Sequence, residues 1–363
     1  MQLTIYRDQA ALAGLEGDWR ALAGRAGAYS RAQLPDYVLG TLGAMPQGHM
    51  LSPAVIACRD EAGLACVWPL GIFPHGDRQA VSHIGCTDEY AGPLIREGAH
   101  APRIADAAMA AARTLGDTVE IYGAAADTPM SQLARRMPAL KYVNPIPSPA
   151  IRLSAHTSFD AWLATKSKSF RQSLRYHRRQ LEAMGRLTFE IATGADAAGV
   201  VRWLFEIKRT ALRESGVGES WILRDWPRES LAGVLSGGAA GVMAAVLRLN
   251  GRTIAAAICF EGSHSLEFVT TCYDPEFARA SPGHLLIEDL ARIAAERRLD
   301  FDFRITPADY KSRWSDHVDW RQTAIVANTP RGARWVAQLR ASRAVRTVRH
   351  RLRRMLTSHP AAA

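Results

Sequence analysis

The sequence has little that is typical of a membrane or exported protein. No apolar run approaches the roughly 20 residues that a membrane-spanning helix needs, and the best candidate, residues 239–247, ends at Arg248. Residues 1–8 lack the basic and then apolar order of a signal peptide. We therefore expect no transmembrane segment and a protein of the cytoplasm.

Cysteine is also scarce. The cysteines are Cys58, Cys66, Cys86, Cys259 and Cys272, an odd number without C-x-x-C spacing. The eleven histidines do not cluster at ligand spacing. These patterns argue against a disulfide framework and against a metal site, and they favour a reducing compartment.

Several catalytic signatures are missing from the chain. It has no G-x-S-x-G, H-E-x-x-H, G-x-x-x-x-G-K-[ST] or G-x-G-x-x-G motif. These absences argue against a nucleophile-elbow hydrolase, a zinc peptidase of that type, a P-loop enzyme and a dinucleotide-binding fingerprint.

The residues that are present indicate a folded protein with two domains. Hydrophobic residues make up 48% and charged residues 22% of the 363 positions, a length that suits two domains of roughly 100–200 residues each. Residues 144–149 read Asn-Pro-Ile-Pro-Ser-Pro, which argues against a helix or a central strand. We therefore predict domains at 1–147 and 148–330, followed by a basic tail at 331–363.

The net charge of +10 belongs almost entirely to that tail. Residues 331–363 hold nine arginines and no Lys, Asp or Glu, which leaves +1 for residues 1–330. The apolar tail residues that fall on one helical stripe are Trp335, Leu339, Val345, Val348, Leu352 and Met355. Such a basic amphipathic helix can lie on an anionic membrane or dock on a partner. A disordered basic extension is the alternative.

Both halves of the chain show a similar order of predicted elements. In the second half we predict strands at 242–249, 253–260 and 266–273, a loop at 274–282, a helix at 283–298 and a strand at 299–303. Asn250-Gly251 is the hairpin signal between the first two strands. In the first half we predict strands at 54–58, 64–73 and 81–94, a helix at 101–115 and a strand at 118–122. The fold class is therefore α/β (α+β), by internal duplication or by coincidence of two α+β domains.

The junction after residue 273 predicts an anion-binding loop. A strand there leads to a helix start, where free backbone N–H groups and the helix dipole favour negative charge. Pro282 suits the first helical turn, Gly283 permits close approach, and Arg279 adds a charge. Together they form a candidate pyrophosphate cradle, with an ordinary helix N-cap as the alternative.

Further motifs accompany these segments: Lys168-Ser169-Phe170-Arg171 with Arg175 and Arg178-Arg179, Asp302-Phe303, Tyr310-Lys311 with Trp314, and the upstream segment 85–94. In this order the segments resemble the acyl-CoA-binding core of GNAT acyltransferases, and with these motifs they resemble in particular the CelD/BcsL-type, FemAB-like branch. The resemblance covers about residues 15–335. It implies two tandem GNAT-like domains, each a mixed, mostly antiparallel sheet flanked by helices, with acyl transfer at the second.

The resemblance also implies acetyl-CoA or another acyl-CoA as co-substrate. The residues that would hold it are Arg279, Ala280, Ser281, Pro282, Gly283 and His284. Tyr273 or Tyr310 could protonate the leaving thiolate, because a phenol has a pKa of about 10. Asp302 could act as a base or orient Lys311, which could neutralise an oxyanion. The family usually has Gly where this chain has Thr306-Pro307, which predicts a differently shaped loop.

Acceptor contacts are predicted in both halves. Asp88, Glu89 and Tyr90 lie in a Gly-bounded loop and suit an amine or a sugar, unless they are solvated turn residues. Arg171 and Arg175 lie on one side of a predicted helix and could meet anionic groups of CoA, a saccharide or tRNA. The first-half loop 96–102 contains an acid, Glu97, that would repel phosphate, so this half is expected to serve the acceptor or the scaffold.

By resemblance the protein would be an N- or O-acyltransferase, an acetyltransferase, acting on a small-molecule or saccharide acceptor of envelope or exopolysaccharide biosynthesis. One alternative is a FemX-like aminoacyltransferase that uses aminoacyl-tRNA, with RNA bound by the basic helix and tail. Another is a non-catalytic binding or scaffold protein of polysaccharide biosynthesis. In each case the tail offers a peripheral contact with the inner face of a membrane.

Overall fold

The computed structural model describes the chain apart from residues 47–50, 86–89, 91, 217–219, 306–307 and 358–363, and apart from the side chains of 344–357. The elements of the first half are β1 (Gln2–Tyr6), α1 (Gln9–Ala13), α2 (Glu16–Ala23), η1 (Arg31–Gln33), α3 (Pro35–Gly43), β2 (Ser52–Pro53), β3 (Val55–Asp60), β4 (Gly63–Trp68), β5 (Leu70–His75), β6 (Arg78–His83), β7 (Leu94–Ile95), α4 (Ala101–Arg113), β8 (Thr118–Ala125) and α5 (Pro129–Arg136).

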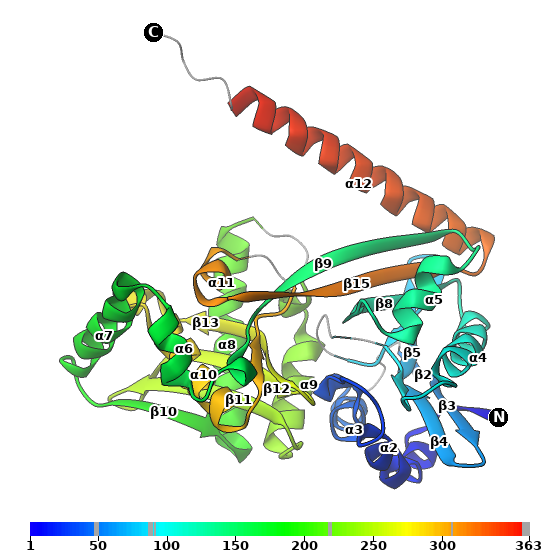
Figure 1. The fold of residues 1–363 in the computed structure, drawn as a ribbon, viewed down its shortest axis with the longest axis horizontal. Helices are drawn as coiled ribbons and strands as arrows, with labels where there is room; N and C mark the ends of the chain where they lie inside the picture. The colour runs from blue at the N-terminus through cyan, green and yellow to red at the C-terminus, as the bar shows by residue number, and fades with distance from the viewer. Residues whose placement is uncertain (47–50, 86–89, 91, 217–219, 306–307, 358–363) are drawn as a thin grey trace.

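The second half begins with a long strand and ends with a long helix. Its elements are β9 (Lys141–Ile151), η2 (Leu153–Ala155), α6 (Phe159–Thr165), α7 (Lys168–Glu182), β10 (Leu187–Ala192), α8 (Gly194–Glu214), η3 (Trp221–Leu223), α9 (Asp225–Ser236), β11 (Val242–Leu249), β12 (Arg252–Glu261), β13 (Ser265–Tyr273), η4 (Pro275–Ala280), α10 (Pro282–Glu296), β14 (Asp300–Asp302), α11 (Asp309–Trp314), β15 (His317–Ala327) and α12 (Pro330–Thr357). Figure 1 shows two α/β lobes bridged by β9 and β15, with α12 projecting from the body.

The predicted order of the second half is confirmed. Strands β11 and β12 form a hairpin around Asn250 and Gly251, whose φ angles of 51° and 82° are those of the left-handed turn that Asn-Gly favours. Strand β13 pairs antiparallel with β12, and α10 then returns the chain so that β14 runs parallel to β13. The predicted loop at 274–282 differs in that it contains the short helix η4.

The first half repeats the parallel unit with changes. Strands β6 and β8 are parallel and α4 lies between them in the chain, as α10 lies between β13 and β14. The predicted strand 64–73 is two strands, β4 and β5, because Pro69 interrupts it and the two parts join different sheets. The predicted stretch 81–94 contains β6 and β7, with residues between them outside the described part of the chain.

The proline-rich stretch 144–149 is not a break in the sheet, contrary to the sequence-based expectation. It lies in β9, which pairs with β15 along most of its length and with β14 at its end, inside an 11-stranded sheet. The prolines occupy alternate positions, 145, 147 and 149, and the carbonyl of Pro149 accepts a hydrogen bond from Phe303 N–H on the side away from β15. The strand therefore keeps its N–H donors on the side of β15, where prolines would be excluded.

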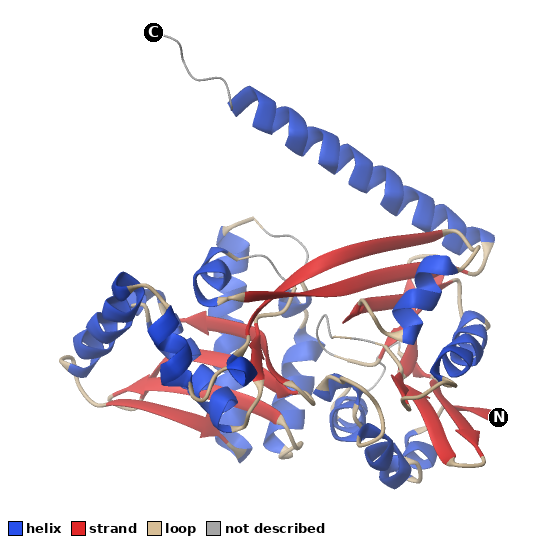
Figure 2. Cartoon of the chain, viewed as in Figure 1, coloured by secondary structure: helices blue, strands red, loops and turns tan. Residues whose placement is uncertain are grey.

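Strands β9 and β15 tie the lobes together. Strand β15 pairs with β8 of the first half and with β9, so each lobe's sheet continues into the other (Figure 2). One hydrophobic core is also shared, since α2 and α3 of the first half pack in the same cluster as α8 and α9 of the second. We keep 1–147 and 148–330 as proposed domains, with these two strands crossing between their sheets.

Candidate active site

Strands β13 and β14 part at a defined residue pair. Their parallel register runs from Ser265 opposite Asp300 to Glu267 opposite Asp302, where β14 ends and β13 continues to Tyr273. Leu266 and Phe268 face the core under α10, so Glu267 between them faces the opposite side, toward the first half. Beyond Glu267 and Asp302, the backbones of β13 and β14 no longer pair with each other.

The predicted donor loop follows the end of β13. Ser281 precedes α10 with φ and ψ of 49°, a left-handed conformation that is uncommon for a residue with a side chain. Ser281 is the N-cap residue of α10, and within the described residues its side chain makes no cap hydrogen bond. A Cβ added to Gly283 would lie 3.4 Å from Cδ1 of Tyr273, which places the helix start against the last residue of β13.

Aromatic side chains support this helix start. Trp314 Nε1 donates a hydrogen bond to His284 Nδ1 at 2.8 Å, and Tyr310 meets the His284 ring edge-on. Burial lowers the pKa of His284, so this imidazole is neutral and keeps Nδ1 as an acceptor. Burial raises the pKa of the half-buried Tyr310 to about 12, whereas Tyr273 is 45% exposed.

Two lysines, the buried Lys311 and the half-buried Lys208, donate to groups near the parted strands. Lys311 Nζ donates to the carbonyls of Phe303 and Arg304 at 2.6 and 3.1 Å, and burial lowers the pKa of Lys311 to about 8. Lys208, from α8, donates to Thr270 Oγ1 at 2.5 Å, and burial lowers its pKa as well. Lys311 is 5% exposed, so it is not a solvated surface lysine.

The basic helix α7 lies beside the donor loop and contacts η4 and α10. Arg178 donates to Glu288 and Asp289 of α10 at 3.1 and 2.8 Å, so this arginine holds the two helices together. Arg171 is half-buried and Arg175 is exposed, and neither forms an ion pair within the described part of the chain. These two remain available for an anionic ligand next to α10.

Asp302 is the centre of a buried hydrogen-bond network. Its Oδ1 accepts from Tyr90 Oη at 3.0 Å, from Ser148 Oγ at 2.7 Å and from the backbone N–H of Arg304 at 2.7 Å. Its Oδ2 lies 3.1 Å from a guanidinium nitrogen of Arg321. The carboxylate is therefore held in one place by donors from both halves of the chain.

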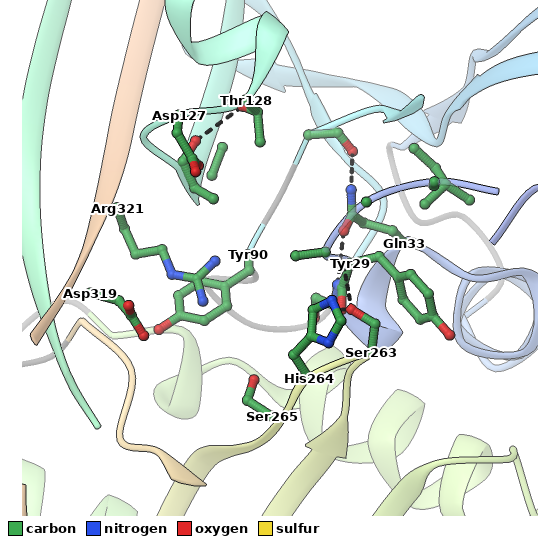
Figure 3. Close-up of a pocket in the computed structure, with 18 of the residues that line it drawn as sticks. Tyr29, Gln33, Tyr90, Asp127, Thr128, Ser263, His264, Ser265, Asp319 and Arg321 are labelled. Carbon is green, nitrogen blue, oxygen red and sulfur yellow. Dashed lines mark hydrogen bonds between the residues drawn. The ribbon is translucent and has the colours of Figure 1, made fainter. Parts of the chain in front are cut away.

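Asp302 and Tyr90 border a pocket of about 840 Å³ between the lobes. Figure 3 shows Tyr90 and Arg321 facing each other on one side, with Tyr29, Gln33, Ser263 and His264 opposite. The pocket is also lined by Glu267, whose Oε2 accepts from the hydroxyl of Ser30 at 2.9 Å. Burial is the main cause that raises the pKa of Glu267, to about 7, and the Asp302 charge adds to it.

The predicted site residues thus fall into two groups. Tyr90 and Asp302 meet at the pocket, whereas Arg279, Ala280, Ser281, Pro282, Gly283, His284, Tyr273, Tyr310, Lys311, Arg171 and Arg175 are not among its lining residues. Asp88 and Glu89 lie outside the described residues, as do Thr306 and Pro307.

Sequence reasoning missed Glu267, Lys208, Ser30 and Arg321. Glu267 had a usable signal, because it is the one charged residue in the predicted strand 266–273. The others belong to elements that carry no motif, and only the fold brings them to the site.

The described residues contain no group of three or more His, Cys, Asp or Glu side chains that could hold a metal ion. Over the same residues, no helix combines the length and apolarity needed to cross a bilayer.

Comparison with known proteins identifies the domain type. Residues 168–312 match the acetyltransferase (GNAT) domain family. No curated protein matched the sequence.

Solved structures share the fold over nearly the whole chain. FemX superposes with a TM-score of 0.64 at 11% identity, covering 91% of this chain and 98% of FemX. The C-terminal domain (DUF2156) of a candidate lysylphosphatidylglycerol synthetase from Agrobacterium fabrum gives 0.56 at 14% identity, covering 91% and 95%. A tandem GNAT protein from the clavulanic acid biosynthesis pathway gives 0.50 at 15% identity, covering 91% and 99%. The chain therefore has a tandem GNAT-like fold, and the match of residues 168–312 to an acetyltransferase (GNAT) domain supports an acyltransferase.

Proposed function

We propose that the protein transfers an acyl group from acyl-CoA to an acceptor bound in the pocket between the lobes. The observation that supports this most directly is the parting of β13 and β14 after Glu267 and Asp302, with the start of α10 at the end of β13. Direct transfer needs a rigidly held donor, an acceptor that can lose a proton, and a stabilised leaving thiolate. Each of these three requirements has a candidate group at or beside the point where β13 and β14 separate.

The donor would bind along β13 and at the start of α10. The uncapped helix start offers backbone N–H groups and the positive end of the dipole to a pyrophosphate. Arg171, Arg175 and the exposed Arg279 would add charge beside it. The pantetheine arm would occupy the strand edge that β13 presents after Glu267.

The reacting groups would meet near the parting. Lys311, on carbonyls just beyond β14, would place a positive charge near the developing oxyanion. Of the two tyrosines, Tyr273 at the exposed end of β13 is the better candidate to protonate the thiolate, because burial raises the pKa of Tyr310 and makes its phenol a weaker acid. The acceptor would approach through the pocket, past Tyr90 and Asp302.

We also propose a class of acceptor. The resemblance to the CelD/BcsL-type branch suggests an envelope or exopolysaccharide precursor, and the pocket volume of about 840 Å³ is large enough for a saccharide-sized acceptor.

Calorimetric titration with acetyl-CoA and longer acyl-CoAs tests the donor assignment. Gly283→Asp should abolish acyl-CoA binding, because it adds a carboxylate where phosphate must approach N–H groups. Gly17→Asp is the matched control, since Gly17 is exposed in α2 and a Cβ there meets nothing within 4 Å. A folded Gly283→Asp protein that binds acyl-CoA like wild type would show that the donor site is elsewhere.

A second candidate is aminoacyl transfer from aminoacyl-tRNA. FemX has the highest TM-score of the three neighbours described, and the basic face of α7 lies beside the donor loop. An RNA donor predicts affinity that falls steeply with salt concentration. Titration with tRNA at two salt concentrations, beside acetyl-CoA, separates the two donors.

A further inference from the structure

We propose that Lys208 is a site of self-acylation, at which acyl-CoA bound along β13 transfers its acyl group to the chain itself. The inference rests on the proposed acyl transfer and goes beyond it, because a side chain of the protein becomes an acceptor in addition to the one in the pocket. It follows from the place of the Lys208 amine on β13, from its bonding partners, and from a comparison with the other lysines.

The backbone of β13 directs the Thr271 carbonyl to the edge of the strand that faces away from β12. Strands β12 and β13 pair antiparallel, with Ala257 opposite Thr271. In such a pair, residues that exchange backbone hydrogen bonds alternate with residues whose N–H and C=O groups point away from the partner strand. Asp274 N–H bonds the Ile254 carbonyl at 2.9 Å, so every second residue pair counted from this one is hydrogen-bonded. Thr271, three positions before Asp274, therefore directs its carbonyl to the other edge, beyond the end of β14.

The amine of Lys208 lies at this open edge. Lys208 belongs to α8, which packs on β13, and its Nζ donates to the Thr271 carbonyl at 3.3 Å and to Thr270 Oγ1 at 2.5 Å. The pantetheine arm of the donor is proposed to lie along the same edge after Glu267. The amine is thus beside the proposed path of the thioester, where a nucleophile held close to its target reacts faster than one in solution.

The surroundings of Lys208 also favour a nucleophilic amine. Only the free amine attacks a thioester, because an ammonium group has no lone pair. Burial lowers the pKa of Lys208 and outweighs the opposing effect of the neighbouring Cys272. Both of its hydrogen bonds go to uncharged oxygens, and within the described residues no carboxylate forms an ion pair with it. A lysine activated by desolvation in this way is a better nucleophile than a solvated one.

The chain has four other lysines, and each is less suited to this reaction. Lys311 is 5% exposed, and its Nζ is held by two carbonyls just beyond β14. Lys166 and Lys141 donate to carbonyls of residues that follow α11 and α5. Lys168 is exposed at the start of α7. Lys208 is therefore the best candidate, and Lys168 serves as an internal comparison.

The step balances without a further reactant. The Lys208 ammonium first gives one proton to water and becomes a free amine. Its Nζ attacks the thioester carbon, so that a C–N bond forms and the C–S bond breaks, and the sulfur leaves with the electron pair of that bond. A second nitrogen proton goes to the thiolate. The products are an amide on Lys208 and the free thiol of CoA.

Acylation changes the edge at which it occurs. It replaces a positive charge by a neutral amide, and it adds an acyl group beside Thr271, where the pantetheine arm is proposed to lie. We therefore expect a chain acylated at Lys208 to bind acetyl-CoA more weakly than the unmodified chain, so that the reaction limits itself.

Peptide mass spectrometry of the full chain after incubation with acetyl-CoA tests the site. Acetylation adds about 42 Da to a lysine. We expect this increase at Lys208 at least tenfold faster than at Lys168, whereas acetyl phosphate, which needs no CoA site, should show no such preference. Gly283→Asp should abolish the reaction of acetyl-CoA at Lys208, and Gly17→Asp should not. Faster acetylation of another lysine, the same preference with acetyl phosphate, or an undiminished reaction in Gly283→Asp would overturn the inference.

Calorimetry before and after this incubation separates the inference from the proposed function. The wild-type chain, once acetylated and desalted, should bind acetyl-CoA at least several-fold more weakly than before. Lys208→Arg keeps a positive charge and cannot be acetylated there, so its affinity should be the same before and after. Unchanged affinity of a chain fully acetylated at Lys208 would contradict the placement of this lysine at the donor edge. If acetyl-CoA binds but Lys208 gains no acetyl group, self-acylation is wrong and the donor assignment survives. If acetyl-CoA does not bind at all, both proposals fail.

Discussion

The hydroxyl of Tyr90 lies 3.0 Å from a carboxylate oxygen of Asp302, although the two residues are 212 positions apart. Tyr90 comes from the loop of the first half, and Asp302 ends the short strand β14 of the second. Ser148 Oγ of β9 donates to the same oxygen of Asp302 at 2.7 Å and lies 2.6 Å from the Tyr90 hydroxyl oxygen. One buried network thus joins the two lobes at the wall of the pocket.

Removing the Tyr90 hydroxyl should lower the free energy of unfolding. Tyr90→Phe leaves Asp302 and Ser148 buried with one partner fewer, which costs about 1–3 kcal/mol of unfolding free energy. Urea unfolding measures the loss, and Tyr176→Phe, at a 62% exposed position on α7, is the control. An unchanged midpoint in Tyr90→Phe would mean that the network adds nothing to stability.

Glu267 should make stability depend on pH. Its pKa is raised from 4.5 to about 7 in the fold, so the folded state binds its proton more tightly than the unfolded chain does. The stability that this provides is present below pH 4.5 and is lost as pH rises through 7, by on the order of 3 kcal/mol at most. Glu267→Gln removes the titration, so its Tm relative to wild type should rise between pH 5 and pH 8. The same Tm difference at both pH values would contradict the raised pKa.

Much of the second half could be predicted from the sequence because its signals are local. The Asn250-Gly251 turn fixes the hairpin register, and the Ser-Pro-Gly start of α10 carries its own helix signal. Because side chains alternate along a strand, Phe301 and Phe303 in the core also predict that Asp302 lies on the opposite face, where the network is found.

The rest depends on long-range pairing that no local pattern contains. Strand β9 looks like a linker because of its prolines, and only its pairing with β15 shows that alternate prolines fit a strand. Arg178 looks like part of an anion-binding face, yet its partners on α10 are 110 and 111 positions away. Glu267 and Ser30 are likewise 237 positions apart.

Replacing two arginines of α7 should have different effects: Arg178 should matter for stability and Arg175 for donor binding. Arg178→Ala breaks partly buried ion pairs with Glu288 and Asp289 and should lower the unfolding free energy by about 1–3 kcal/mol. Arg175→Ala should leave stability within about 0.5 kcal/mol of wild type, because this side chain is exposed. It should instead weaken donor binding and reduce the salt dependence of that binding. Urea unfolding and titration at two salt concentrations separate the two effects, and equal behaviour of both variants would contradict the assignment.

The basic tail should consist of two parts with different roles, which meet at about residue 344. The first part of α12 is packed on the body, since Val336 is buried, Leu339 packs beside Ile325, and Arg343 donates to the Tyr142 hydroxyl at 2.8 Å. Residues 345–363 add five arginines and no acid. A basic segment of this kind gains about 1 kcal/mol per arginine close to an anionic bilayer, so it predicts binding to such a surface.

Deleting residues 345–363 should therefore leave the Tm and acetyl-CoA binding unchanged and reduce binding to phosphatidylglycerol vesicles at least tenfold. A deletion from residue 337 would be a poorer test, because it also removes Leu339 and Arg343 from their packing. Replacing the five arginines at 346, 349, 351, 353 and 354 by Gln is the matched variant, because it removes the charge and keeps the length. Vesicle co-sedimentation at low and high salt measures both. If the truncated, the substituted and the full-length chains bind vesicles equally, the tail is not a membrane contact. If only tRNA binding falls, its partner is a nucleic acid.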